Sequence, residues 1–219
     1  MTDAPAPRTI RFPLAQLHEQ AEAFWQRFPA ACAVRGGAAF EVARDGASLQ
    51  LPLVAPRARD GERIGDYVER FTNLDEVQLV VLLQAGAMAF GCWRGEELLQ
   101  HKAVRKYVVR GNGRSQATHL KTRGKSRYGS RLRLQNWKSL LVETCERLAD
   151  CEQELGPFER VFYSAPVRVW SDLLETTTPP FARDDARLQR LPLHVHRPDH
   201  QELLRVRAAM ASGRVVLPS

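Results

Sequence analysis

The chain has 219 residues, of which 44% are hydrophobic and 8% aromatic, enough for one large domain or for one domain with an appendage. It contains no run of roughly 18 apolar residues and no basic-then-apolar leader, which argues against a transmembrane helix and a secretory signal, so we expect a cytoplasmic protein. The formal net charge is +7, and the basic residues are unevenly spread along the chain.

The first third of the sequence predicts a helix followed by a hairpin. Residues 14–28 place apolar side chains at three- and four-residue spacing, which is typical of an amphipathic helix, and Pro29 ends the pattern. Residues 39–42 and 49–51 alternate in polarity on either side of an Asp-Gly turn, which predicts a hairpin. A short helix is expected through residues 67–71. We assign residues 1–72 to an N-terminal lobe formed by this helix and hairpin.

The second part begins near Asn73 with the pattern of a β-meander. Residues 77–84 are a near-continuous apolar run, which indicates a strand buried on both faces. Further strands are expected at residues 87–93 and 98–110. Residues 111–129 contain four glycines and no hydrophobic period, so they predict a loop, and a loop of this length is unusual inside a compact domain.

A helix is expected over residues 131–155, with Ser130 as its N-cap. Its predicted buried stripe consists of Leu134, Trp137, Leu141, Cys145 and Leu148. The remaining predicted elements are strands at 160–165 and 191–196, helices at 167–174 and 201–211, an Asp199 cap on the second of these helices, and an edge strand at 215–217. This order predicts an α/β (α+β) fold, with one mixed sheet and packed helices, for a domain spanning residues 73–219.

Neither a metal nor a cofactor is expected. The four cysteines form no C-x-x-C pair and are too scattered for a zinc finger, so we expect reduced and mostly buried thiols. His194 and His196 would share one face of a strand, but two histidines are too few for a metal site.

The basic residues gather in one window, from Leu98 to Val142, that contains no Asp or Glu. It holds twelve Lys or Arg residues, which leaves 20 basic against 25 acidic residues in the rest of the chain. Such asymmetry is the electrostatic signature of a protein that binds a polyanion. Arg131 and Arg133 would lie in the first turn of a helix, where the dipole disfavours cations, so an external anion is the better explanation for them.

The segment from His101 to Trp137 resembles the release-factor-like domain of ribosome-quality-control peptidyl-tRNA hydrolases, in the eukaryotic-type class 1 release factor superfamily. Three features carry the resemblance: a basic strand over residues 102–109, a G-x-x-Q element at Gly113-Arg114-Ser115-Gln116, and a basic loop leading into the helix start Gly129-Ser130-x-Leu132-Arg133. It is best over residues 75–165. The sequence departs from the family's Gly-Gly-Gln by having Arg114-Ser115 before the glutamine.

The resemblance implies a release-factor-like catalytic domain that hydrolyses peptidyl-tRNA in stalled or split large ribosomal subunits, acting as a stand-alone monomer. Its partners would be the large subunit, its rRNA and the peptidyl-tRNA. The resemblance assigns catalysis to Gln116, with Ser115 and Gly113. Because glutamine has no useful pKa, it would orient water through its amide and backbone N–H. We expect phosphate contacts from Lys102, Arg105, Lys106, Arg110, Arg114, Lys121, Arg123, Lys125, Arg127, Arg131 and Arg133.

Two alternatives remain open from the sequence. In the first alternative, the chain is a non-catalytic module that binds the ribosome or tRNA. In the second, it is a nuclease that removes the tRNA 3′ end. A Ser/His/Asp hydrolase is disfavoured, because there is no G-x-S-x-G motif and neither Ser115 nor Ser164 has an identifiable partner.

Overall fold

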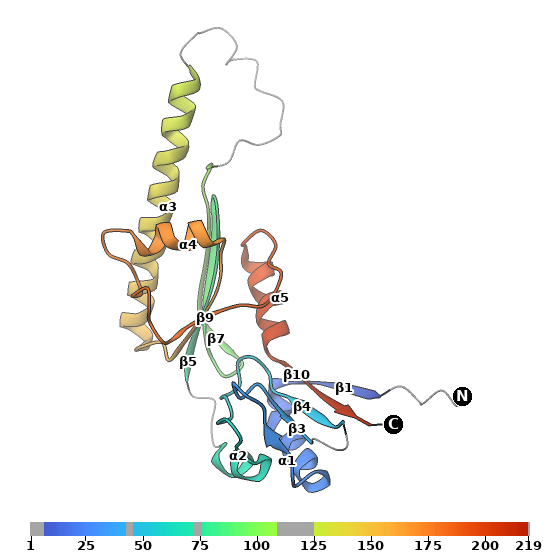
Figure 1. Ribbon diagram of the computed structural model, residues 1–219. Helices are drawn as coiled ribbons and strands as arrows, with labels where there is room; N and C mark the ends of the chain where they lie inside the picture. Colours follow the sequence, from blue (N-terminus) through green and yellow to red (C-terminus); the bar gives the residue numbers. More distant parts are fainter. Residues whose placement is uncertain (1–6, 43–45, 72–75, 109–124, 219) are drawn as a thin grey trace, which may run out of the picture. The chain divides into compact units, whose positions relative to one another are not determined.

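Two compact units make up the chain, and each has its own five-stranded sheet (Figure 1). The computed structural model describes residues 7–42, 46–71, 76–108 and 125–218, with residues 125–128 described by their backbone. Unit 1 contains residues 1–75 and 207–219, and unit 2 contains residues 76–206. No helix in the described part of the chain is long and apolar enough to cross a membrane.

The sheet of unit 1 is antiparallel, with the strand order β1-β10-β4-β3-β2. Its strands are β1 (Arg8–Pro13), β2 (Cys32–Ala33), β3 (Ala39–Glu41), β4 (Ser48–Gln50) and β10 (Ser212–Leu217). The predicted hairpin is confirmed, because Phe40 in β3 lies opposite Leu49 in β4 and both side chains are fully buried. The predicted first helix is confirmed as η1 (Leu14–Gln16) followed by α1 (Leu17–Arg27), and the short helix is α2 (Ile64–Arg70).

The last strand, β10, joins the first part of the chain. It pairs with β1 on one side and with β4 on the other, so the expectation of an edge strand at residues 215–217 was wrong. The physical reason is a pairing between segments at opposite ends of the sequence, in which Ile10 lies opposite Val215. Residues 207–219 therefore belong to the same compact unit as residues 1–75, whereas the sequence-based division grouped them with residues 73–206.

Unit 2 has a mixed sheet with the order β7-β6-β5-β8-β9, as the fold class predicted. The strands are β5 (Val77–Gln84), β6 (Ala87–Arg94), β7 (Glu97–Arg105), β8 (Arg160–Ser164) and β9 (Leu188–Arg190). The first three form the expected antiparallel meander, and β8 adds to β5 in parallel. Seven consecutive residues of β5 are buried, which confirms a strand covered on both faces.

Helices lie on both faces of this sheet (Figure 1). The apolar cluster between the sheet, α3 (Lys125–Leu155) and α4 (Val167–Leu174) includes Leu79 and Val81 of β5, Leu148 of α3 and Leu173 of α4. On the opposite face, a Cβ placed on Gly91 of β6 would lie 3.2 Å from Leu203 of α5 (His200–Met210), so the sheet and this helix approach closely. Burial of β5 on both sides follows from this arrangement.

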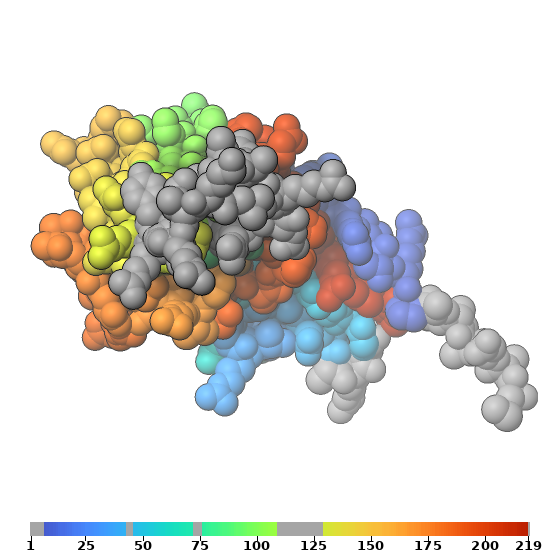
Figure 2. Space-filling view, turned by 90° about the horizontal axis from the view of Figure 1, so that it is seen from above, coloured from blue at the N-terminus to red at the C-terminus, as the bar shows by residue number. Residues whose placement is uncertain are grey.

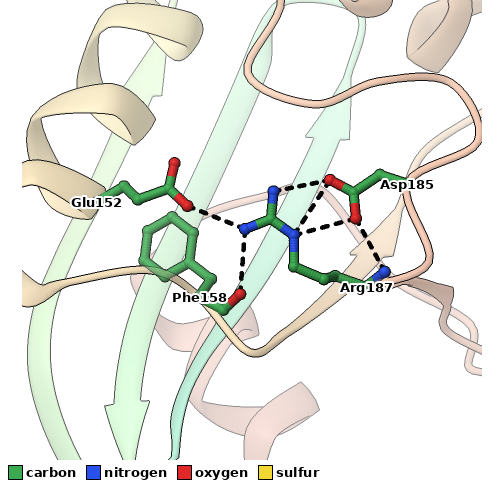
Figure 3. Close-up of polar contacts among 4 residues, drawn as sticks. All are labelled: Glu152, Phe158, Asp185 and Arg187. Atoms are coloured by element: carbon green, nitrogen blue, oxygen red, sulfur yellow. Dashed lines mark hydrogen bonds and ion pairs between the residues drawn. The ribbon is translucent and has the colours of Figure 1, made fainter.

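An arginine joins the C-terminal end of α3 to the strand β9 (Figure 3). The Arg187 guanidinium donates to both carboxylate oxygens of Asp185, to Glu152 of α3 at 3.0 Å and to the Phe158 carbonyl at 3.2 Å. The hydrogen bonds to Asp185 contribute most to raising the pKa of Arg187, and Glu152 adds to the effect. The same pairing with Arg187 lowers the pKa of Asp185. A planar, always-charged group with several donors suits this position better than lysine would.

The predicted strand at residues 191–196 was wrong. Leu191 still donates its N–H to the Tyr163 carbonyl, but the backbone beyond it leaves the sheet. Pro192 has no N–H to give to a ladder, and the carbonyls that follow bond to side chains instead. The carbonyl of His196 accepts from Gln84 Nε2 at 2.9 Å, and that of His194 accepts from Arg205 at 2.8 Å.

Glu202 holds this segment against α5. Its buried carboxylate accepts the His196 N–H at 2.6 Å and two hydrogen bonds from Arg205 at 2.7 and 2.8 Å. The predicted cap is confirmed, because Asp199 Oδ1 accepts the Glu202 N–H at 2.9 Å. The hydrogen bonds from Arg205 lower the pKa of Glu202 to about 2, against the opposing effect of its burial.

This pKa predicts an acid-sensitive contact. Because the folded-state pKa is depressed, the stabilisation is complete above the ordinary carboxyl pKa of 4.5 and is lost as the pH falls toward about 2. We expect Glu202→Gln to cost about 1–2 kcal/mol at neutral pH, after allowance for solvent screening of the half-exposed Arg205. Urea unfolding at a series of pH values measures this. The mutant should lose less stability than the wild type between these limits, whereas the exposed control Glu159→Gln should follow the wild type.

Candidate nucleic-acid interface

Only part of the predicted site lies within the described residues. Lys102, Arg105, Lys106, Arg131 and Arg133 are described with their side chains, and Lys125 and Arg127 are placed by their backbone in the first turn of α3. Seven predicted residues lie outside the described part: Arg110, Gly113, Arg114, Ser115, Gln116, Lys121 and Arg123. The described part therefore gives the two ends that flank residues 109–124.

The helix α3 starts earlier than predicted. It runs from Lys125 to Leu155, about 46 Å at 1.5 Å per residue, so residues 125–129 are helical where a loop was expected. Ser130 is inside the helix and is not its N-cap; its hydroxyl accepts a hydrogen bond from Arg133 at 3.2 Å. Glycine at position 129 and the absence of an apolar period concealed this extra turn, because both are typical of loops.

Charge changes sign along α3. Its first fourteen residues carry five basic and no acidic side chains, namely Lys125, Arg127, Arg131, Arg133 and Lys138. From residue 143 onward it carries Glu143, Glu146, Asp150, Glu152 and Glu154, with Arg147 among them. This order opposes the helix macrodipole, which favours acidic residues at the start and basic residues at the end. Intrahelical electrostatics therefore do not account for Lys125 and Arg127 in the first turn, and Arg131 and Arg133, expected in that turn, lie beyond it because α3 begins earlier.

The described part of the basic start of α3, from residue 129 onward, lies at the surface. Figure 2 shows yellow-green residues of α3 at the surface of unit 2. Arg131 is exposed and Arg133 is half-buried, and within the described residues neither forms an ion pair. Leu134, predicted to be buried, is 55% exposed, because the residues of α3 that pack against the sheet begin at Trp137, which is partly buried.

Two of the predicted phosphate ligands are already paired within the fold. Lys106 Nζ lies 2.8 Å from Glu143 and 2.7 Å from the Ser139 hydroxyl, and Arg105 lies 2.6 Å from Asp199. The sequence around Arg105 and Lys106 contains no acidic residue. The fold brings Glu143 of α3 to Lys106, and it brings Asp199, the cap of α5, to Arg105. Lys102, by contrast, is exposed on β7 and has no ion pair within the described residues.

Just before residue 109, the residues that follow β7 are hydrogen-bonded to α3 and to the turn between β5 and β6. The Tyr107 carbonyl accepts from Asn136 Nδ2 of α3 at 2.8 Å, and the Lys106 N–H donates to the Gly86 carbonyl at 3.0 Å. The predicted strand to Arg110 accordingly ends at Arg105. Sequence reasoning missed Asn136, Ser139 and Glu143; their three- and four-residue spacing on one helix face was a usable signal, but nothing in it pointed to β7.

Gly86 is predicted to be intolerant of alanine. Its φ is +85°, and a Cβ there would lie 2.8 Å from the Lys106 carbonyl oxygen, whereas Gly156 has φ +86° with nothing within 4 Å. Both substitutions incur the left-handed backbone cost of about 1–2 kcal/mol. We expect Gly86→Ala to cost about 2 kcal/mol more than Gly156→Ala, because the backbone of residues 106–108 must move. Urea unfolding of the two variants tests this, and equal losses would contradict the close approach.

The chain is similar to a known protein family, to a mouse protein and to a solved structure. A model of the family described as Bacteroidetes VLRF1 release factor matches residues 78–217. The mouse protein "tRNA endonuclease ANKZF1" is 32% identical over 133 residues, covering 58% of this chain but 18% of its own length. A solved structure, "Vms1 mitochondrial localization core", has a similar fold, with a TM-score of 0.53 and 11% identity over 97% of this chain and 84% of that chain.

The resemblance to the release-factor-like domain is thereby confirmed, and the match extends beyond the residues 75–165 on which it was first seen. It includes the G-x-x-Q element, the whole of α3 and the strand β10. Since the family model matches well over half of the chain, this protein belongs to the Bacteroidetes VLRF1 release factor family.

Proposed function

We propose that this protein hydrolyses the ester bond of peptidyl-tRNA held in a stalled or split large ribosomal subunit. The observation that carries the proposal is that the release-factor family match includes both Gln116 and the basic start of α3. In this reading the ribosomal subunit, its rRNA and the peptidyl-tRNA are the partners, and the chain acts as a monomer in the cytoplasm.

The reaction asks little of the protein beyond placing a water molecule. A peptidyl-tRNA ester is already activated, so a group that orients water and stabilises the developing negative charge is sufficient. Gln116 offers an amide that both donates and accepts, together with its backbone N–H. Gly113 gives the backbone freedom to enter a confined RNA site, and Ser115 precedes the glutamine as a small residue.

Binding would rest on phosphate contacts around this element. Of the predicted phosphate ligands whose side chains are described, Arg131, Arg133 and Lys102 form no ion pair with a described carboxylate. Arg110, Arg114, Lys121, Arg123, Lys125 and Arg127 would add to them. Arg105 and Lys106 would contribute by fastening the end of β7 and by their summed charge, because their side chains already contact Asp199 and Glu143.

A peptide-release assay tests the proposal. Purified protein is added to large ribosomal subunits that carry a labelled peptidyl-tRNA, and free peptide is measured over time at several salt concentrations. The proposal predicts multiple-turnover release that weakens as salt rises, because phosphate contacts are lost. Stable binding to the loaded subunits without release at any salt would instead identify a non-catalytic binding module.

A second candidate reaction is cleavage of the tRNA itself near its 3′ end. It is favoured by one observation, that the mouse relative carries the name tRNA endonuclease. This chain covers 18% of that protein's length, so the relative's activity is transferred here only as a candidate. Ester hydrolysis frees a peptide with a C-terminal carboxylate and a full-length tRNA, whereas cleavage near the 3′ end leaves the peptide esterified to a short nucleotide fragment and shortens the tRNA, which separates the two reactions.

A further inference from the structure

Cys92 lies at an irregularity in the sheet of unit 2. In the pairing of β6 with β7, Cys92 lies opposite Gln100 and Trp93 lies opposite Leu98, so one extra residue is accommodated on β7. Such bulges redirect side chains and are frequent beside functional sites. The Cys92 side chain is fully buried in the apolar cluster beneath α3.

A second cysteine meets it from α3. Cys151 is also buried, and its thiol is in close contact with Oε1 of Gln100, the cross-strand neighbour of Cys92. Cys92 and Cys151 belong to the same buried apolar cluster, and no disulfide joins them. The amide of Gln100 is held in turn by Glu154, which accepts from its Nε2 at 3.1 Å. Two reduced thiols therefore lie in one buried cluster beside Gln100, where β6 and α3 pack together.

Cys151 also lines a pocket of about 260 Å³, whose walls include Gln100, His101, Lys102 and Arg147. This volume is several times the roughly 30 Å³ that a water molecule occupies, so a small oxidant fits. Three of these residues can carry positive charge, and Asp150 and Glu154 of α3 face them from the same pocket. Interaction with Cys92 holds the pKa of Cys151 below its ordinary value, whereas the pKa of Cys92 is raised.

We propose that Cys92 and Cys151 are a redox modification site, which forms an intramolecular disulfide when a hydroperoxide enters the pocket. The Cys151 thiolate attacks one peroxide oxygen and becomes a sulfenic acid, and the other oxygen leaves as hydroxide and takes up a proton. The Cys92 sulfur then attacks the sulfenic sulfur, its proton passes to the departing hydroxyl, and water leaves. Two thiols and hydrogen peroxide give one disulfide and two waters.

The consequence is a covalent link between α3 and the sheet. Cys92 and Cys151 are 59 positions apart, so the bond would close a long loop and restrict the unfolded chain. The oxidised protein should therefore unfold at a higher temperature than the reduced protein, by several degrees, and should return to the reduced value when a dithiol is added. This effect does not depend on what reaction the protein catalyses.

The test uses the full chain with Cys32→Ser, because Cys32 is exposed and would otherwise form disulfides between molecules. The folded protein is treated with hydrogen peroxide, free thiols are alkylated, and peptides are mapped by mass spectrometry. We expect a cross-linked pair of peptides containing Cys92 and Cys151, with Cys145 left as an unmodified internal control. Adding Cys92→Ala should stop the reaction at a sulfenic acid on Cys151, which dimedone traps.

Either of two results would overturn the proposal. In one, Cys92 and Cys151 stay reduced in the folded protein and cross-link only after denaturation. In the other, Cys145 is oxidised as readily as Cys151, which would show that the pocket gives no selectivity. Since the first measurement needs no substitution in the core, it stands even when Cys92→Ala folds poorly.

Discussion

Gln116→Ala is expected to slow peptide release by a factor of about 10²–10³. The alanine removes the amide that would orient water and contact the developing charge, while the basic residues that bind RNA remain. Co-sedimentation with large ribosomal subunits should therefore be unchanged. The measurement is the initial rate of peptide release under saturating protein, so that a difference in affinity does not enter the rate.

A matched control is available in the same basic window. Gln135 is an exposed glutamine on α3, and Gln135→Ala should release peptide at the wild-type rate. If Gln116→Ala also keeps the wild-type rate, the assignment of the chemistry to this residue is wrong. If both variants slow release equally, the effect comes from general disturbance of the basic surface.

Removing the two arginines at the start of α3 is expected to weaken binding to large ribosomal subunits by about 30-fold at physiological salt. Arg131→Gln/Arg133→Gln deletes two cations that have no carboxylate partner within the described residues, so little internal stability is lost. The slope of log K against log salt should become less negative by about 1.5, because fewer counterions are released. A binding titration at four or five salt concentrations gives both quantities.

The control for this prediction removes the same charge elsewhere. Arg190 and Arg197 are exposed in unit 2 and are not ion-paired within the described residues. Arg190→Gln/Arg197→Gln should leave the salt slope near the wild-type value. A slope that changes equally in the two double variants would mean that binding senses only the net charge of the protein.

Short sequence patterns predicted the helices and strands whose buried faces can be recognised from their own residues. The strand at residues 77–84 was visible because both of its faces are apolar, and α4 was predicted at the observed residues, 167–174. The strand β1 was missed and β10 was misplaced at an edge, because each is defined by pairing with the other across some 200 residues of sequence. The segment at 191–196 alternates like a strand, yet its carbonyls bond to Gln84 and Arg205.

The same limit applies to the site. Charge counting located the basic segment, and the family resemblance singled out Gln116. Neither showed that Lys106 contacts Glu143 or that Arg105 contacts Asp199, because both acids lie outside the acid-free window. A segment of sequence shows how many charged residues it contains. Whether each of them is free to contact an anion depends on which elements pack against it in the fold. The role of Lys106 at the end of β7 therefore became visible only in the fold.

The state of the tRNA 3′ end after peptide release tests the central claim most directly. Large subunits carrying peptidyl-tRNA are incubated with the protein, and the tRNA is resolved on a denaturing gel and tested for re-aminoacylation. Ester hydrolysis predicts a full-length tRNA with an intact CCA end that is charged again by its synthetase. A shortened tRNA that cannot be recharged, appearing together with a peptide still esterified to a 3′ nucleotide fragment, would contradict ester hydrolysis and identify a nuclease.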